Sequence, residues 1–540
     1  MSGTSDQASA RDEAPSARSV SSAREQKTGW WSDGIAIALA VLALLFGVVK
    51  HSPFFVDDAY ISLRYAENLV CCGELTWNIG EYHEGYTNFL YVLMSAALMA
   101  VGLEPIVAVR LLNVVAAVFL IALVAWGLRL VAPGRAMALA RGALVLTIGL
   151  TPGIAIWVLG GLEPVVLGAF LTGGTVSLLL VLRDGLTWRN GLLTASAFSF
   201  AVLTRMDAAV FIGATGLSVF AALDGSWRRR FVIAFIAAGI PALVSFGHMA
   251  WRISYYGEFF PLTFYTKTGV PQELRVLSSA LYSRSVMRWA PAILIAIFSL
   301  VLLVTQRRRD ARLALLGLPL LAQAIYITWS GADHMIGARM AVPFMGVAMI
   351  FVGALAASFA PKIRALLPAL ALGSSLAMSI VVAPAGPDRV VSDARAIGAY
   401  IEKNWAPGQI IALHTAGAIP FYADKHTYID LLGLIDPVIA KREEFPIVTL
   451  AQIVPGHSKG SGKYVLSRDP DIIIAGLVRG GVIEDPAFLT DVELADLEEF
   501  ARCYVLREVE VPYRRRVLGT DWTAPGHFTF RYYERVCEGS

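Results

Sequence analysis

The chain has 540 residues, of which 56% are hydrophobic and only 16% are charged, and its mean hydropathy is +0.60. Soluble proteins of this length carry about a quarter charged residues, so a wholly soluble protein is excluded. The formal net charge of +3 and the lack of a basic stripe interleaved with aromatic residues exclude a nucleic-acid-binding protein.

Apolar runs long enough to cross a bilayer as helices recur from Ile35 to about Val382. Before them, residues 1–28 are rich in Ser and Ala and predict a disordered cytoplasmic tail. Residues 29–384 predict a membrane module, and residues 385–540 lack a spanning-length run and predict a separate soluble α/β domain. We therefore expect a polytopic α-helical membrane protein with a C-terminal domain.

Basic residues between the apolar runs set the orientation, because short cytoplasmic loops are enriched in Lys and Arg. The basic loops are those around Arg135, Arg183, Arg228, Arg307 and Arg364. Placing all of them inside puts the N-terminus in the cytoplasm and the C-terminal domain outside. If the run from Thr87 to Val101 crossed the membrane, the basic loop at Arg135 would lie outside. We therefore expect this run to lie along the outer membrane surface, which leaves about eleven transmembrane helices.

With this topology, the polar residues that are costly near a membrane fall on the outer side, many of them in an acidic first external loop, residues 50–104. Ionisable groups at membrane depth are functional candidates by default. The candidates are Asp57, Asp58, Arg64, Glu81, His83, Glu84, Glu163, Arg205, Asp207, Lys267, Asp333, His334 and Arg339.

Several of these residues also have structural explanations. Arg205 and Asp207 can form a mutual ion pair, which is the usual reason that charges are tolerated at membrane depth. Glu163 precedes a proline and can begin a helix, where an acid favours the positive end of the helix dipole. His334 and Arg339 can be ordinary loop residues.

The adjacent acids Asp57 and Asp58 open the segment VDDAYISLRYAEN. Asp57 suits an N-cap and Asp58 suits the first turn of a helix that starts at Ala59. Because neighbouring residues point about 100° apart on a helix, one acid can enter a site while the other caps the helix or pairs with Arg64. A carboxylate here can accept a proton from a hydroxyl or hold a divalent cation such as Mg²⁺, Mn²⁺ or Ca²⁺.

The stretch DDAYISLRYAENL…WNIGEYHEGYTNFLY resembles the first external loop of GT-C-type membrane glycosyltransferases, and among them that of the AftB-like arabinofuranosyltransferases. Further segments match in order: WVLGGLEP (157–164), LTRMD (203–207), RISYYGEFFPLTFYTK (252–267), WSGADHMIGARMAVP (329–343) and IDLLGLIDPVIA (429–440). The sequence departs from the family pattern at LTRMDA, GLEPVV, PLTFYTK and GADHM, which leaves the identity of the sugar open.

This resemblance implies a GT-C fold with an external α/β domain. It implies transfer of a sugar, D-arabinofuranose in the AftB-like enzymes, from a polyprenyl-phosphate donor to a cell-envelope glycan or glycolipid acceptor at the outer face of a bacterial inner membrane. The acid/base or metal-associated aspartate of the family falls on Asp58 or Asp57. The alternatives are a transporter or flippase of a lipid-linked sugar, and a GT-C enzyme that uses mannose or another pentose.

The remaining candidates receive roles from this mechanism. The cations expected to hold the donor phosphate are Arg205, Lys267 and Arg339. The residues expected to hydrogen-bond the sugar hydroxyls are Glu81, Glu84 and Asn88. The residues expected to form apolar walls against the sugar are Tyr60, Tyr86 and Tyr265.

The C-terminal segment predicts an α/β core, with a helix at about 391–404 and strands in IIALH, HTYID and HFTFRYYER. An acceptor-binding role and a structural lid are both compatible with it. The four cysteines, Cys71, Cys72, Cys503 and Cys537, lack metal-ligand spacing. They are either unpaired or structural thiols, or Cys503 and Cys537 form a disulfide if the domain lies outside the cytoplasm.

Overall fold

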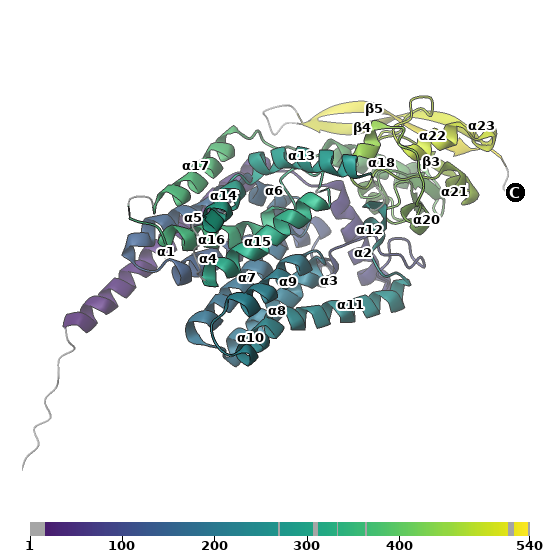
Figure 1. The fold of residues 1–540 in the computed structure, drawn as a ribbon. Helices are drawn as coiled ribbons and strands as arrows, with labels where there is room; N and C mark the ends of the chain where they lie inside the picture. Colours follow the sequence, from purple (N-terminus) through teal and green to yellow (C-terminus); the bar gives the residue numbers. More distant parts are fainter. Residues whose placement is uncertain are drawn as a thin grey trace, which may run out of the picture.

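The computed structural model describes residues 17–267, 271–305, 311–331, 333–361, 364–516 and 523–537. Residues up to Val381 form a bundle of helices, and the rest form a domain at one end of it (Figure 1). The α-helices of the bundle are α1 (Ala17–His51), α2 (Asp57–Cys72), α3 (Phe89–Ala100), α4 (Pro105–Val131), α5 (Ala138–Leu150), α6 (Pro152–Leu159), α7 (Pro164–Asp184), α8 (Trp188–Thr204), α9 (Ala208–Ala222), α10 (Trp227–Ala234), α11 (Ile240–Tyr256), α12 (Leu262–Lys267), α13 (Gln272–Trp289), α14 (Ala292–Thr305), α15 (Ala311–Trp329), α16 (Met345–Ala357) and α17 (Leu366–Val381). Short 3₁₀ or π segments are η1 (Arg135–Met137), η2 (Phe235–Gly239) and η3 (Val342–Phe344).

The chain has the architecture of a polytopic membrane protein. Within the described ranges, 5 helical segments are long and apolar enough to cross a membrane, or up to 7 if each of two bent pairs is one span. One bent pair is α5 with α6, which meet at 43°. Other apolar helices are shorter, so the count of about eleven crossings stays a prediction.

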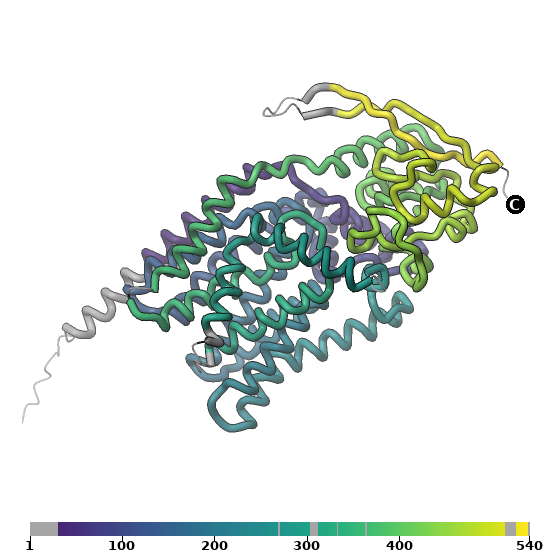
Figure 2. Tube along the Cα trace, turned by 45° about the horizontal axis from the view of Figure 1, so that its top comes forward, coloured from purple at the N-terminus to yellow at the C-terminus, as the bar shows by residue number. Residues whose placement is uncertain are grey.

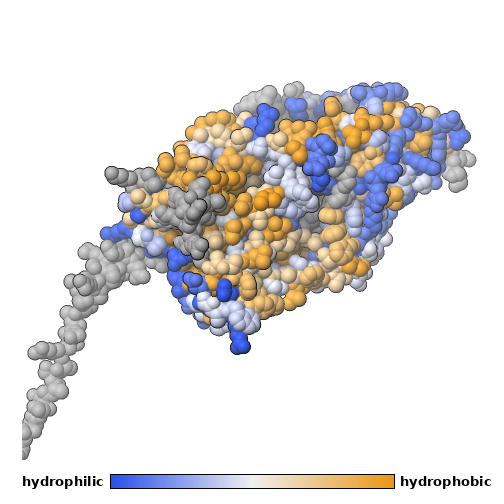
Figure 3. Space-filling model, viewed as in Figure 1, coloured by the Kyte–Doolittle hydropathy of each residue, from blue (hydrophilic) through white to orange (hydrophobic). Residues whose placement is uncertain are grey.

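Apolar side chains also cover the outside of the bundle, as lipid contact requires. The space-filling view has its hydrophobic surface over the helices and its hydrophilic surface mostly over the C-terminal domain (Figure 3). At the end of the bundle remote from the domain, Arg129 and Arg141 pair with Asp33 of α1. These pairs hold the basic loop after α4 beside the start of the first apolar run.

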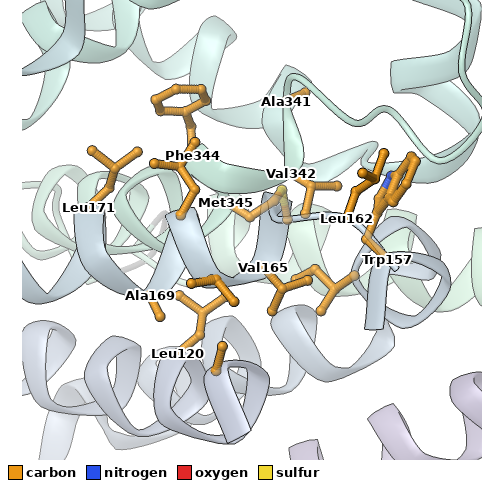
Figure 4. Close-up of a cluster of buried hydrophobic side chains, with 14 of the residues drawn as sticks. Leu120, Trp157, Leu162, Val165, Ala169, Leu171, Ala341, Val342, Phe344 and Met345 are labelled. Carbon is orange, nitrogen blue, oxygen red and sulfur yellow. The ribbon is translucent and has the colours of Figure 1, made fainter. Parts of the chain in front are cut away.

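Helix α16 forms the centre of the bundle. All its residues from Met345 to Ala356 are buried, and it packs against α4, α7, α14 and α15. A helix that is apolar on all sides is stable only when it is enclosed by protein or lipid. Figure 4 shows the junction, where Met345 and Val342 lie with Leu120 of α4, Val165 of α7 and Trp157 of α6.

Two expectations for the N-terminal third meet the structure differently. Helix α1 begins at Ala17 and so includes residues 17–28, while the disorder of the cytoplasmic tail stays a prediction. This segment contains Ala, Arg, Glu, Gln and Lys, which are good helix formers. Residues 1–16 lie outside the described residues. Helix α3 has 12 residues, which gives a length of roughly 18 Å and is too short to span a bilayer.

The C-terminal domain contains a five-stranded mixed sheet in the order β2-β1-β3-β5-β4, with β1, β2 and β3 parallel and β5 antiparallel to both β3 and β4. The tube drawing follows the chain from α17 into the first helix of this domain (Figure 2). The elements are α18 (Arg389–Asn404), β1 (Ile410–Leu413), α19 (Ala418–Tyr422), β2 (Thr427–Asp430), α20 (Pro437–Ala440), η4 (Leu450–Ile453), α21 (Gly462–Ser467), β3 (Ile472–Ile474), α22 (Leu489–Ala495), α23 (Glu498–Cys503), β4 (Tyr504–Arg516) and β5 (Thr523–Arg535). The predicted helix and the three predicted strands are confirmed.

All four cysteines are in disulfides. Cys503 pairs with Cys537, which links the end of α23 to the segment that follows β5. Cys71 pairs with its neighbour Cys72 at the end of α2. The expectation of free thiols is therefore wrong, and the Cys71–Cys72 pair was not anticipated, because adjacent cysteines in a sequence carry no pairing signal.

Candidate active site

A cavity of about 1390 Å³ lies where the membrane module meets the C-terminal domain. Its walls come from the start of α2, the loops before α3, α7 and α9, the α12 region, the loop after α15, the linker before α18, and residues that follow β1, β2 and β3. The segments that the topology placed outside therefore converge on one cavity. Small-molecule sites rarely exceed about 1000 Å³, so this cavity has room for more than one ligand.

Most of the site residues predicted from the sequence line this cavity. They are Asp57, Asp58, Tyr86, Asn88, Glu163, Arg205, Asp207, Lys267, Asp333, His334 and Arg339.

Asp57 is the first residue of α2, and its carboxylate binds the C-terminal domain. Its two oxygens accept hydrogen bonds from the backbone N–H groups of Gly417 (3.2 Å) and Ala418 (2.8 Å) at the start of α19. Burial raises the pKa of the Asp57 carboxyl to about 7, while these two N–H donors act in the opposite sense. Asp57 thus has the capping role that the sequence left open for one of the two acids, but on a helix of the other domain.

Gly417 makes this contact sterically possible. A Cβ atom at Gly417 would lie 2.1 Å from the backbone oxygen of Asp57 and 2.6 Å from its carboxylate. We expect Gly417→Ala to destabilise the junction by about 1–3 kcal/mol, as overpacking of a tight contact does. Thermal unfolding of the full chain measures this, with Gly213→Ala as the control, since nothing lies within 4 Å of a Cβ at Gly213. Equal stability of the two variants would contradict the contact.

Asp58 faces the cavity and is half-buried. In the part of the chain that the structure describes, its carboxylate has no hydrogen-bond or ion-pair partner. It interacts electrostatically with Lys267 and with Asp388 of the linker before α18. Asp58 is therefore the acid of the pair that is available to a ligand.

Arg205 is the centre of a buried ion cluster. Its guanidinium binds both oxygens of Asp207 (2.9 and 2.8 Å) and one oxygen of Glu163 (3.0 Å). The other Glu163 oxygen accepts a hydrogen bond from the Asn88 amide at 2.9 Å, and Asn88 accepts one from Ser62 at 3.1 Å. The mutual ion pair that the sequence left open is present, and the cluster ties the loop before α3 to those before α7 and α9.

Lys267, Asp333 and Arg339 form a second charged group. Arg339 pairs with Asp333 at 2.9 Å, and His334 lies 3.6 Å from the same carboxylate. The Lys267 side chain is accessible from the cavity, yet the surrounding protein desolvates it and lowers the pKa of its ammonium group, with Asp333 and Asp58 acting in the opposite sense. Among the described residues, this ammonium group makes no direct hydrogen bond.

Five predicted residues lie outside the cavity, and two of them pack α2 against the domain. The Tyr60 hydroxyl lies 3.1 Å from that of Tyr422, with its ring buried among aromatic residues. Arg64 donates to the carbonyl oxygens of Trp77 and Pro420 and is buried. These residues face the other side of α2 from Asp58, so neither contacts a sugar bound in the cavity, and Arg64 pairs with neither aspartate.

The other three hold neighbouring segments together. Glu81 pairs with Arg468 at 2.9 Å, and fully buried Glu84 pairs with Arg252 of α11. The Tyr265 carbonyl accepts a hydrogen bond from Lys459 at 2.9 Å, and its ring does not line the cavity. Because their partners are elsewhere, we assign no sugar contact to Glu81, Glu84 or Tyr265.

The cavity also contains residues that sequence reasoning missed, notably Asp388, His414, His457 and Phe488. His414 is the last residue of the predicted strand IIALH, and ligands in parallel sheets bind beyond the carboxyl ends of strands. That rule would have found His414. Nothing in the sequence places Asp388 or Phe488 near Asp58, since their position depends on how the domain docks.

The residues around Asp57 and Asp58 do not fit a divalent metal well. Both Asp57 oxygens already accept backbone hydrogen bonds. Within the described ranges, no group of three or more His, Cys, Asp or Glu side chains is arranged to hold a metal ion, whereas Mg²⁺ and Ca²⁺ need several oxygen ligands. We therefore derive no step through a metal.

A family model described as "Domain of unknown function (DUF8728)" matches residues 388–532, within the C-terminal domain. No curated protein matches the sequence significantly. The fold is similar to that of the Archaeoglobus fulgidus oligosaccharyltransferase in complex with Zn and sulfate, with a TM-score of 0.51 at 12% identity over 75% of this chain. The chain has the GT-C-type fold.

The chain covers 62% of that oligosaccharyltransferase, so the two proteins share an architecture over part of the larger chain. Weaker similarity extends to ArnT from Cupriavidus metallidurans bound to undecaprenyl phosphate, with 13% identity over 74% of this chain and 86% of that one and a TM-score of 0.47. It also extends to the archaeal oligosaccharyltransferase AglB from Archaeoglobus fulgidus with an inhibitory peptide and a dolichol-phosphate, with 12% identity over 74% and 65% and a TM-score of 0.48.

Proposed function

We propose that the chain is a glycosyltransferase that moves a sugar from a polyprenyl-phosphate donor to a cell-envelope glycan or glycolipid acceptor. Transfer takes place on the extracytoplasmic face of a bacterial inner membrane, with the N-terminus cytoplasmic. The observation that carries the proposal is the carboxylate of Asp58, which has no partner within the described ranges and shares one cavity with the ammonium group of Lys267. The GT-C-type fold, shared with an oligosaccharyltransferase, supports it.

Lys267 and Arg339 are the cations that suit the donor phosphate. Among the residues that the structure describes, Lys267 makes no direct hydrogen bond, and Arg339 pairs with Asp333 and donates to the Met335 sulfur. An ammonium group binds phosphate as a point charge, and a guanidinium binds it through several donors. Arg205 uses three of its nitrogens on Asp207 and Glu163, so we assign it to holding the cavity wall rather than the phosphate.

Asp58 acts as the general base. As the acceptor hydroxyl attacks the anomeric carbon, a bond forms from its oxygen to that carbon, and the bond from the carbon to the phosphate oxygen breaks. The acceptor proton passes to the Asp58 carboxylate. The departing polyprenyl phosphate keeps the electron pair of the broken bond, and Lys267 stabilises its negative charge. The protein contributes positioning and preorganised charge, because phosphate is already an adequate leaving group.

D-Arabinofuranose is the sugar we propose, and this choice rests on the AftB-like motifs. Labelled polyprenyl-phosphoryl arabinose, a second pentose and mannose, each supplied to membranes that contain the protein, test it. We expect transfer from the arabinose donor to an added glycan. If only the mannose donor or the second pentose donor supports transfer, the proposed sugar is wrong. If no donor supports transfer, the proposed function is wrong. Movement of an intact donor across the membrane would indicate the flippase instead.

We expect Lys267→Met to raise the donor KM by about tenfold or more, because a hydrogen bond to a charged group contributes roughly 1.5–3 kcal/mol. Steady-state transfer kinetics at varied donor concentration measure this. Lys425→Met is the matched control, since Lys425 is an exposed lysine that pairs with Glu402 away from the cavity. A donor KM that is unchanged in Lys267→Met would remove Lys267 from the phosphate site.

A further inference from the structure

The carboxyl ends of the three parallel strands open into the cavity. His414 follows β1, Leu432 lies just after β2, and Gly476 lies just after β3, and all three line the cavity wall. In open sheets with parallel strands, ligands bind outside these carboxyl ends. The ligand-binding edge of the sheet, at the carboxyl ends of its parallel strands, therefore faces the cavity that contains Asp58.

Three rings form a stack at this end of the cavity. The Phe488 ring is nearly parallel to the imidazoles of His414 (centroids 4.2 Å apart) and His457 (6.0 Å). The ring of His334, from the loop after α15, meets His457 edge-on at 5.3 Å. The stack thus runs from the sheet edge to the charged residues of the membrane module.

The imidazoles in this stack have hydrogen-bonding capacity that the protein does not use. His414 is only 6% exposed. Among the described residues, neither of its ring nitrogens nor Nδ1 of His457 has a partner with good hydrogen-bond geometry, although the backbone of Ile474 acts on His414 and that of Pro455 acts on His457. The nearest acid to His414, Asp491, lies 3.7 Å away and accepts backbone hydrogen bonds from Gly476 and Phe488. Buried polar atoms are nearly always paired with protein groups or water, so these nitrogens are suited to hydrogen-bond a group bound in the cavity.

Both histidines are neutral at physiological pH. Burial lowers the pKa of His457 to about 3 and also lowers that of His414, although Asp491 acts in the opposite sense there. A neutral imidazole offers one N–H donor and one acceptor nitrogen, which matches a hydroxyl group. The neighbouring wall residues Leu432 and Leu434 are apolar. Lys267 lies beside this wall, since a Cβ atom at Gly456 would be within 4 Å of both Leu434 and Lys267, so an uncharged sugar bound here would border the ammonium group.

We propose that the ring stack and the sheet edge form an acceptor subsite, which holds the terminal sugar ring of a neutral glycan by hydrogen bonds from His414 and His457 to its hydroxyls. The bound ring presents its free hydroxyl toward Asp58, and the donor phosphate binds next to it at Lys267, which adjoins Leu434. A cavity of about 1390 Å³ accommodates both substrates. The assignment rests on the proposed transfer reaction and adds the class of acceptor and the residues that select it.

The test measures binding to the full-length protein in lipid nanodiscs without donor. The probes are fluorescent hexasaccharides of arabinofuranose and of mannopyranose, and a hexapeptide with the same label. We expect one of the two hexasaccharides to bind the wild-type protein saturably. Its affinity for His414→Phe and for His457→Phe should be at least tenfold lower. Phenylalanine keeps the ring stack, so the fold is retained. Binding of labelled undecaprenyl phosphate is expected to be unchanged in both variants.

His426→Phe is the matched control, because His426 is a buried histidine of the same domain with an unpartnered Nδ1 that does not line the cavity. It is expected to bind the glycan like wild type. Three results would overturn the subsite. They are equal glycan affinity in wild type and all three variants, binding of the peptide alone, and binding of neither hexasaccharide. Histidine-dependent glycan binding without any transfer would refute the transferase and keep the glycan site, so the two failures are distinguishable.

Discussion

Replacing Asp58 with asparagine is expected to lower the kcat of sugar transfer by about 10²–10⁴-fold, the usual contribution of a general base. Asparagine has nearly the same shape but cannot accept the acceptor proton. Since Asp58 has no partner among the described residues, the change breaks no structural contact, and the donor KM should stay within a few fold of wild type. Transfer kinetics of purified protein, together with thermal unfolding, measure both effects.

Glu81→Gln provides the control for Asp58→Asn. Glu81 is an acid of the same external loop, but it pairs with Arg468 and does not line the cavity. We expect its kcat to remain near that of wild type. Full activity of Asp58→Asn, or an equal loss in both variants, would show that the Asp58 carboxylate is not the base.

The buried pair of Glu84 and Arg252 should dominate the stability of the external loop. Both side chains are at most 2% exposed, and the backbone oxygen of Glu84 also accepts a hydrogen bond from Leu262 at 2.8 Å. We expect Arg252→Met to destabilise the protein by about 3–5 kcal/mol, because it leaves an uncompensated buried carboxylate. Denaturant unfolding in detergent measures the loss.

The double variant Glu84→Gln/Arg252→Met separates charge from packing. It removes both charges, so we expect it to recover much of the stability that Arg252→Met loses. A double variant less stable than Arg252→Met would contradict this, and would indicate that the pair acts through the shape of its side chains. Glu81→Gln again serves as the control, since its ion pair is more exposed.

The sequence predicted the architecture because hydropathy and loop charge are local properties. The apolar runs marked the membrane module, and the change of composition near residue 384 marked the domain. Loop charge placed Glu163, Arg205 and Asp333 on one side, and the structure brings all three to one cavity. Their grouping needed no knowledge of how the helices pack, only of the side to which each loop belongs.

The roles of individual residues in the external loop could not be predicted in the same way. Asp58 and Arg64 lie on one helix, but α19 covers the face with Arg64, whose partner Pro420 is 356 positions away in the sequence. Which face of α2 meets the domain is therefore a tertiary property. The same limit hid Asp388 and Phe488, which reach the cavity only because the domain docks onto the module.

The most direct test of the proposed function measures both reaction products in the same sample. Purified full-length protein in nanodiscs is given labelled polyprenyl-phosphoryl arabinofuranose and an arabinofuranose hexasaccharide. The released polyprenyl phosphate and the new glycosidic bonds are then quantified together. We predict one new glycosidic bond for each polyprenyl phosphate released, and neither product from Asp58→Asn above its residual rate. Release of polyprenyl phosphate without a new glycosidic bond, or an intact donor after prolonged incubation, would contradict the proposal.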